Sequence, residues 1–327
     1  MKMKISLILV ILLFVSPLIK SQHYIKMEES ARLKKLEAPK GKVSIVLDTD
    51  TYNEIDDQFA LAYAYLSKDK IQLEAVYAAP FLNKRSQSAG NGMEKSYQEI
   101  LRLLALLGKS SEGFAYRGSD RFLGDTSKPV RSEAAIDMVK KAMAATTDNP
   151  LYVVAIGAIT NVASAILIEP KIIDKIVVVW LGGNGLDWPN QKEFNLKQDV
   201  LAAQVVLNSG VPLVIYPCQP VVSHLLTTIP ELEYFLKGKN KLADYLLQST
   251  IEYSAGAKAW SKVIWDVAAL AWLVNPSWTP ANLVHSPILT DQVTYSVDHS
   301  RHFIKMVTSV NRDAIFRDLF GKLTDNK

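Results

Sequence analysis

The sequence predicts an α/β protein with one open, mostly parallel β-sheet and helices on both faces. Five short apolar runs are rich in Val and Ile, which is typical of strands that are buried on both faces. Longer stretches with helical spacing of apolar residues lie between these runs, and such alternation favours a parallel sheet. The predicted strands cover residues 43–47, 73–78, 151–156, 176–181 and 213–216.

The predicted helices follow these strands in order. After the first strand, Ile55, Phe59, Tyr63 and Leu66 recur on one helical face. After the second, the stretch 93–107 ends at Gly108, a residue type that commonly terminates helices. Helical patterns also start near residues 160 and 198, after the third and fourth strands. We find no internal repeat and no interdomain linker, so we predict a single domain over residues 41–327.

The first 22 residues have the layout of a secretory signal peptide. Lys2 and Lys4 precede an apolar stretch at 5–19, which Pro17 interrupts and which is short for a membrane-spanning helix. We therefore expect export, to the periplasm or the medium, with cleavage near Ser21 and no stable membrane partner afterwards; an uncleaved anchor is the alternative. Residues 23–40 form a charged lead-in to the domain.

Charge and cysteine content restrict the possible functions. The net charge is +4, but three lysines and no acid lie in residues 1–22, so the rest of the chain carries only +1. No basic run with interleaved aromatic residues is present, so the sequence does not favour binding to nucleic acid. Cys218 is the only cysteine, which excludes an intramolecular disulfide; its place after an apolar strand suggests a partly buried thiol.

An acidic cluster directly follows the first predicted strand. Five carboxylates lie within ten positions: Asp48, Asp50, Glu54, Asp56 and Asp57. In open parallel sheets, sites gather at the carboxyl ends of the strands, and polar or glycine-containing loops follow the next three strands as well. Crowded carboxylates repel each other, so they must remain in water, take up protons or bind a cation.

Two interpretations of this cluster do not involve a nucleoside. The string "DTDTY" is similar to the DxDxT pattern of haloacid-dehalogenase-type phosphatases, in which Asp48 would attack a phosphoryl group, Asp50 would act as acid and base, and Mg²⁺ would assist. However, Tyr52 stands where that pattern has Thr, and no later acidic pair follows a strand. The simplest alternative is a solvated helix start, where the helix dipole favours anions.

Four segments, in order, resemble the inosine–uridine-preferring nucleoside hydrolases. They are "DTD" with the later "DD", "GAITN", "LGGNG" with "KEFN", and "VIWDVAALAWLV", and they span residues 43 to about 275. The resemblance implies a Rossmann-like nucleoside hydrolase fold. It also implies hydrolysis of the N-glycosidic bond of nucleosides to ribose and free base, in nucleoside catabolism and purine or pyrimidine salvage. Family members are commonly dimers or tetramers, so a homo-oligomer is expected.

The same resemblance implies a Ca²⁺ site and a set of roles. The implied metal ligands are Asp50, Asp57, the backbone carbonyl of Thr160, and Asp266; such oxygen ligands suit Ca²⁺. Asp50 would also act as the general base, taking a proton from a water that the metal makes more acidic. The ribose hydroxyls would be held by Asp56, Glu193, Asn195 and Asp266. The further candidate substrate-binding residues are Asn83, Leu181 and Trp265.

The chain departs from the family pattern at several positions. Five residues separate Asp50 from Asp56 where three are usual, so the loop bulges and can bring Tyr52 or Asn53 into the pocket. Asn184 and Asn190 both remain candidates for a family asparagine in the loop before Glu193.

The position before Asp266 is also unusual. Trp265 stands where many members have a histidine that protonates the leaving base, and His224 is the histidine that could approach the site instead. A stacked indole could favour protonation of a purine ring. A nucleoside-binding protein that kept the pocket but lost turnover is therefore a third alternative.

Overall fold

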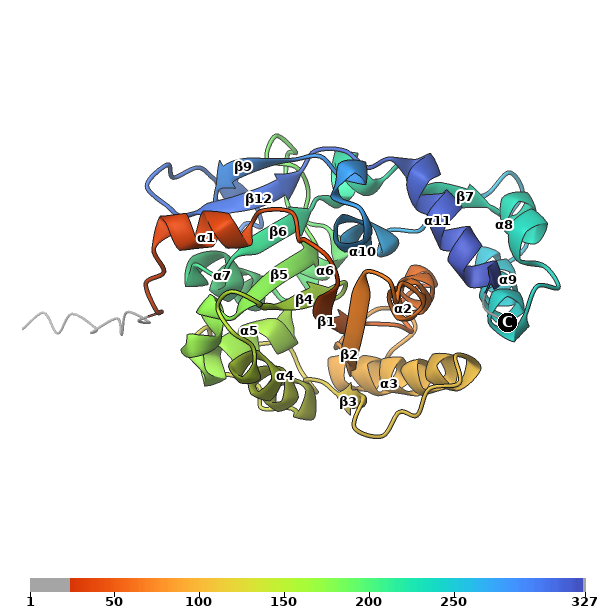
Figure 1. Cartoon of the computed structure of the whole chain (residues 1–327), viewed down its shortest axis with the longest axis horizontal. Coiled ribbons are helices and arrows are strands. Elements are labelled where there is room, and N and C mark those ends of the chain that lie inside the picture. Colours follow the sequence, from red (N-terminus) through yellow and green to blue (C-terminus); the bar gives the residue numbers. More distant parts are fainter. Residues whose placement is uncertain (1–23, 326–327) are drawn as a thin grey trace, which may run out of the picture.

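The computed structural model describes residues 24–325, so the predicted signal peptide lies outside the described part. Eight strands form one sheet in the order β3-β2-β1-β4-β5-β6-β12-β9, as Figure 1 shows. All neighbouring pairs are parallel except β12 and β9. The strands are β1 (Val43–Thr49), β2 (Ile71–Ala78), β3 (Ala115–Arg117), β4 (Leu151–Ala155), β5 (Ile176–Leu181), β6 (Leu213–Tyr216), β9 (Ala281–His285) and β12 (Phe303–Val307).

The remaining elements are helices and two small antiparallel pairs. The α-helices are α1 (Glu29–Lys35), α2 (Asp56–Leu66), α3 (Ala89–Leu106), α4 (Glu133–Ala144), α5 (Thr160–Ile168), α6 (Phe194–Gln198), α7 (Val200–Ser209), α8 (Ile229–Leu236), α9 (Lys241–Ser254), α10 (Val267–Val274) and α11 (Arg312–Asp325). The short helical turns are η1 (Pro170–Asp174), η2 (Cys218–Val222) and η3 (Pro276–Trp278). The pairs join β7 (Leu226–Thr228) to β8 (Ser261–Val263) and β10 (Ile288–Leu289) to β11 (Tyr295–Ser296).

Two apolar layers cover the faces of the sheet. On one face, Ile45 and Leu47 of β1 pack with apolar residues of α2, α3, α10 and α11. On the other face, Val46 of β1 packs with apolar residues of α4, α5 and α7. This alternation follows from strand geometry, since successive side chains point to opposite faces. The predicted open sheet with helices on both faces is therefore confirmed.

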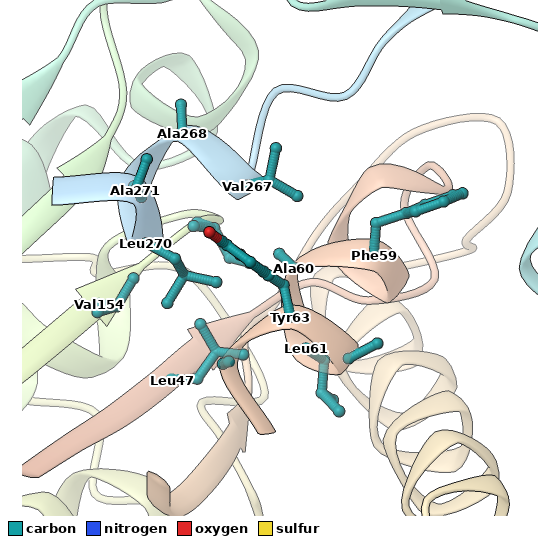
Figure 2. Packing of buried hydrophobic residues seen from close by; sticks show 14 of the residues in the cluster. Leu47, Phe59, Ala60, Leu61, Tyr63, Val154, Val267, Ala268, Leu270 and Ala271 are labelled. Carbon is teal, nitrogen blue, oxygen red and sulfur yellow. The ribbon is translucent and has the colours of Figure 1, made fainter. Parts of the chain in front are cut away.

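The layer that contains α2 and α10 supports the acidic cluster. Figure 2 shows Ala60 and Tyr63 of α2 beside Leu47 of β1 and Leu270 of α10. Each fully buried leucine, such as Leu47 and Leu270, contributes about 1.5–3 kcal/mol. Because the two helices pack through this layer, their first residues are held side by side at one edge of the sheet.

Strand order explains where the site lies. The chain runs outward from β1 to β2 and β3, and then returns to β4 on the other side of β1. At such a reversal, the loops after the two neighbouring strands diverge to opposite faces and leave a crevice. The carboxyl ends of β1 and β4 meet there, where Asp48 pairs with Ala155.

Most of the predicted strands match the structure, with small differences at the ends. Strands β5 and β6 have the predicted bounds, whereas β1 continues to Thr49 and β2 begins at Ile71. Three strands of this sheet were not predicted: β3, β9 and β12. The lead-in also differs, because it contains α1, where the buried Arg32 donates to the carbonyl of Gly210 at 3.0 Å. Among residues 24–325, no helix is long and apolar enough to cross a membrane.

Candidate functional site

A cavity of about 450 Å³ opens at the carboxyl edge of the sheet. It collects residues from the loops after β1, β2, β4, β5 and β6, and from the segment before α10. Its lining residues are Asp50, Asn53, Glu54, Asp56, Asp57, Asn83, Ile156, Leu181, Asn184, Trp188, Asn190, Lys192, Glu193, Phe194, Asn195, Cys218, Gln219, Trp265 and Asp266.

Three buried carboxylates lie together at the base of two helices. Asp56 and Asp57 are the first residues of α2, and Asp266 directly precedes α10. Each offers an oxygen, and these three oxygens all lie within 4.8 Å of one another. The fold therefore brings together acids that are more than 200 positions apart in the sequence.

Asp50 lines the same cavity, and its side chain lacks hydrogen-bond partners in the described part of the chain. Both of its carboxylate oxygens are buried and have no hydrogen-bond partner among the described residues. Burial raises the pKa of Asp50 well above its usual range, and the neighbouring Asp57, Asp56 and Glu54 raise it further. A buried carboxylate without a donor is costly to ionise, so this residue fits a site that receives a cation.

The other acids respond in the same direction. Burial and the charge of the neighbouring Asp56 raise the pKa of Asp57 to about 7. A hydrogen bond from the Thr49 hydroxyl to Asp57, at 2.5 Å, opposes this change. Burial and the nearby Asp56 raise the pKa of Asp266 well above its usual range. Without a cation, the cluster therefore holds protons at pH values where free carboxylates are ionised. Its all-oxygen donor set suits a hard ion such as Ca²⁺.

The structure does not bring Thr160 to this cluster. Thr160 is the first residue of α5, and its hydroxyl donates to Asp199 at 2.6 Å. Within an α-helix, its carbonyl faces the amide four residues later, and Thr160 does not line the cavity. Ile156, at the end of β4, lines the cavity instead, and its carbonyl accepts a hydrogen bond from Asn195 at 3.2 Å. The resemblance of this loop to the family suggested Thr160 as the backbone metal ligand. The general tendency of sites to lie at the carboxyl ends of parallel strands indicates Ile156 instead.

Glu193 and Asn195 are fixed by backbone hydrogen bonds. Glu193 caps α6, and its carboxylate accepts from the amides of Asn195 at 2.9 Å, Leu196 at 3.1 Å and Gly183 at 2.8 Å. The side-chain amide of Asn195 donates to the backbone carbonyls of Leu181, at 3.0 Å, and of Ile156. Burial raises the pKa of Glu193, and the three amides oppose that change. Both residues, and Leu181, line the cavity.

The longer loop contributes Asn53 and Glu54 to the cavity, but not Tyr52. Asn83 lines the cavity and donates to the Asn53 side chain at 2.6 Å. Tyr52 lies outside, where the Arg85 guanidinium is 4.3 Å from the centre of its ring. The two extra residues therefore widen the polar wall of the cavity and tie it to the loop after β2.

Two further asparagines and two tryptophans also line the cavity. Asn184 and Asn190 both lie at the cavity, and the Asn184 side chain donates to the Asn190 carbonyl at 3.0 Å. Trp265 lines the cavity beside Asp266, and Trp188 also lines it. His224 does not, because its ring nitrogen contacts the Val310 carbonyl at 2.9 Å away from the cavity.

Asp48 plays a supporting part. It is fully buried, does not line the cavity, and accepts a hydrogen bond from Asn161 at 2.7 Å. Burial raises its pKa to about 7. The Asn161 side chain also accepts from the amide and the hydroxyl of Ser119, both at 2.8 Å. Asp48 therefore ties the end of β1 to α5 and to the loop after β3.

Sequence reasoning missed several cavity residues. Cys218 lines the cavity, as Glu193 does. Its position just after the strand at 213–216 was a usable signal, because strand ends converge at this edge. Trp188 and Lys192 carried no such signal, since they lie in an irregular loop, and Gln219 lies in the short turn η2.

Comparisons with known proteins agree with this geometry. A family model described as inosine-uridine preferring nucleoside hydrolase matches residues 45–317. A pyrimidine-specific ribonucleoside hydrolase, RihA of Enterobacter sp. (strain 638), is 30% identical over 264 residues, which cover 71% of this chain and 79% of that protein. RihA of Escherichia coli O9:H4 (strain HS) is 27% identical over 262 residues, with the same coverage.

Solved structures share the fold. A purine-preferring ribonucleoside hydrolase from Gardnerella vaginalis superposes with a TM-score of 0.69 at 19% identity, covering 86% of this chain and 98% of that one. A plant nucleoside hydrolase superposes with a TM-score of 0.68 at 19% identity, covering 86% and 99%.

Proposed function

The chain belongs to the inosine-uridine preferring nucleoside hydrolase family, and on that premise we propose that it hydrolyses the N-glycosidic bond of nucleosides to release ribose and free base. The observation that carries this proposal is the position of Asp50. Its two unpaired, buried oxygens lie in a cavity shared with three clustered carboxylates. A catalytic carboxylate and a cation site in one pocket are what metal-assisted hydrolysis requires.

We propose that Asp50, Asp57 and Asp266 hold a Ca²⁺ ion, with the Ile156 carbonyl as the backbone ligand in place of Thr160. The support is the chemistry of the donors, since all four offer oxygen, the three carboxylates are buried, and both oxygens of Asp50 lack a hydrogen-bond donor among the described residues. When bound, the ion would lower the pKa of a nearby water molecule.

The reaction itself is assigned to residues of the cavity. Asp50 accepts the proton of the attacking water, because its buried and negatively charged surroundings increase its affinity for protons. The sugar hydroxyls donate hydrogen bonds to the carboxylates of Asp56, Glu193 and Asp266, and the side-chain amide of Asn195 also bonds them. Asn83 and Leu181 border the same space. As the bond to the base breaks, the sugar becomes positively charged, and the surrounding carboxylates stabilise that charge.

The base is proposed to lie against Trp265, which stands beside Asp266 in the cavity wall. An indole face can stack on either kind of base, so it does not by itself select one. The relatives' names differ in the same respect, since one is pyrimidine-specific and another purine-preferring. Both classes of nucleoside therefore belong in the test.

Two general properties complete the proposal. We propose that residues 1–22 direct export and are removed, which N-terminal sequencing of the protein from the periplasm or medium would test. We also propose a homo-oligomer, either a dimer or a tetramer, which light scattering of the purified protein would test.

The proposal is tested by incubating the pure protein with Ca²⁺ and a panel of purine and pyrimidine ribonucleosides, and by measuring ribose and free base. Release of both in equal amounts supports the proposal. Binding of nucleosides without release would instead favour a binding protein. Release of phosphate from phosphomonoesters with Mg²⁺ would favour the phosphatase alternative; against it, Asp48, the required nucleophile, is fully buried and does not line the cavity.

A further inference from the structure

Lys262 is a buried lysine just behind the acidic cavity. It lies in β8, four residues before Asp266, and only 7% of the residue is exposed. Because lysine is rarely buried unless it is paired, its partners need to be identified. Its ammonium forms an ion pair with Glu54 and a second one with Asp56 Oδ1 at 3.4 Å. Lys262 itself does not line the cavity, whereas both of its partners do.

The two partners are also held from other directions. Asp56 Oδ2 accepts a hydrogen bond from the Trp265 amide at 3.1 Å, so its two oxygens are fixed by one segment of chain, residues 262–265. Glu54 Oε1 accepts a hydrogen bond from the Tyr253 hydroxyl at 2.7 Å, which ties the long loop to α9. One ammonium therefore joins the loop after β1, the start of α2 and the strand before α10.

The ammonium stays charged in this position. Burial lowers the pKa of Lys262, but Asp56 and Glu54 outweigh that effect and raise it above its usual value. The protein thus places a permanent positive charge next to Asp56, whose carboxylate lies within 4.8 Å of those of Asp57 and Asp266. This charge has two consequences of opposite sign: it orders a carboxylate of the cavity, and it repels a cation at the neighbouring ligands.

We propose that Lys262 is a positioning residue of the nucleoside hydrolase site. It fixes Asp56 in the orientation that receives a sugar hydroxyl, fixes Glu54 of the longer loop, and offsets part of the negative charge beside the metal ligands. The proposal rests on the proposed function for its substrate, but its effect on the binding of Ca²⁺ can be measured without turnover.

The test is the pair of variants Lys262→Met and Lys262→Arg, with KM, kcat and the Ca²⁺ dissociation constant measured for each. Lys262→Met keeps most of the apolar stem and removes the charge. We expect KM to rise by about tenfold or more, because an unclamped Asp56 loses its fixed geometry. We expect Ca²⁺ to bind more tightly by roughly tenfold, because a nearby positive charge has been removed. Lys262→Arg should restore both quantities to within about threefold of the wild type.

Two further variants make the test specific. Glu54→Gln removes a negative charge from the same network, so it should weaken Ca²⁺ binding where Lys262→Met strengthens it. Lys237→Met removes the charge of an exposed, ion-paired lysine far from the cavity, and should change neither quantity. If Lys262→Met fails to fold, the double variant Lys262→Met with Glu54→Gln removes the ion pair as a unit and leaves only Asp56 without its cation. KM must still rise in that variant.

The possible outcomes separate this inference from the function on which it rests. A wild type that releases no ribose contradicts the proposed function alone, and calorimetry of Ca²⁺ binding then tests the charge effect by itself. An active wild type with an unchanged KM in the folded Lys262→Met or double variant overturns the positioning role. Weaker Ca²⁺ binding in Lys262→Met also overturns it, since a purely structural lysine would produce that result.

Discussion

Asp50 shows how one side chain can be prepared for two tasks by its surroundings. Its oxygens lack hydrogen-bond donors among the described residues, and three other carboxylates raise its pKa. A side chain in this position gains a cation when the metal is bound and attracts a proton from water during the reaction. The same features make it destabilising on its own, which is typical of catalytic groups.

We predict that Asp50→Asn abolishes turnover while the protein still folds. The substitution preserves the shape and one oxygen but removes the basicity, and general-base catalysis is typically worth about a hundredfold to ten-thousandfold. Ribose release and the circular dichroism spectrum check the two parts. Asp137→Asn is a matched control, because Asp137 is also buried but does not line the cavity, and it accepts a hydrogen bond from the Tyr77 hydroxyl. Near-normal ribose release by Asp50→Asn would exclude Asp50 as the base.

Trp265 is predicted to matter more for some leaving groups than for others. If its indole stacks on a purine and favours protonation of the ring, Trp265→Ala should slow purine nucleosides by about a hundredfold and p-nitrophenyl riboside only slightly, since that leaving group needs no proton. The alanine keeps the backbone amide that holds Asp56. Trp188→Ala, on the same cavity, is the control. Equal losses on both substrates would leave Trp265 only a packing role.

The residues that the sequence located best are those at strand ends. Asp50, Asp56 and Asp57 follow a buried strand directly, so their place at the sheet edge could be predicted from the strand alone. Thr160 does not line the cavity, whereas Ile156, four positions earlier at the strand end, does, because the similar segment includes both the strand end and the start of the next helix. Lys262 could not be found, since its importance comes from partners about 200 residues away.

At the scale of elements, the acidic cluster joins two helices that begin at the same point. Asp57 belongs to α2 and Asp266 precedes α10, and the helices are packed below them through apolar residues such as Tyr63 and Leu270. Like charges at this junction push the helix ends apart, whereas a shared cation would draw them together. The metal is therefore expected to contribute to the stability of the fold as well as to the reaction.

We predict that Asp57→Ala and Asp266→Ala each weaken Ca²⁺ binding and reduce the stabilisation that Ca²⁺ gives. A ligand at a hundred times its dissociation constant stabilises the native state by about 2.7 kcal/mol, and a variant that no longer binds it loses that amount. The measurement is the melting temperature with Ca²⁺ and with chelator. In the variants the two values should nearly coincide. A wild type whose melting temperature ignores the chelator would contradict the metal site.

The sequence predicted the central elements and missed the outer ones. Strands β4, β5 and β6 and most of β1 are apolar because helices cover both of their faces, and this leaves a clear pattern. Strand β3 has only three residues, and β9 is a partly exposed edge strand, so neither has a continuous apolar run. In β12, Lys305 interrupts the apolar run, and its two neighbours, Ile304 and Met306, both pack into the apolar layer on one face of the sheet.

For the whole molecule, the buried acids link stability to pH. In the metal-free protein, burial raises the pKa of Asp48 and of Asp57 from 3.8 to about 7. Between these values the folded state binds more protons than the unfolded state, so stability decreases as the pH rises from about 4 to 7.

We therefore predict that, in chelator, the melting temperature is several degrees higher at pH 5.5 than at pH 8. Ca²⁺ replaces the protons at Asp57, so adding it at pH 8 should recover much of the loss. Melting curves at the two pH values, with and without Ca²⁺, measure this. A metal-free protein that becomes more stable toward pH 8 would show that these acids are ionised without cost.

The account depends most on the claim that one cation site and one carboxylate base together cleave nucleosides. The most direct measurement is ribose release from inosine and uridine by the wild type, first in chelator and then after Ca²⁺ is restored. We predict that release stops in chelator and returns with Ca²⁺ on at least one of the two substrates. Release that continues at the same rate in chelator, or no release with Ca²⁺ present, would contradict the account.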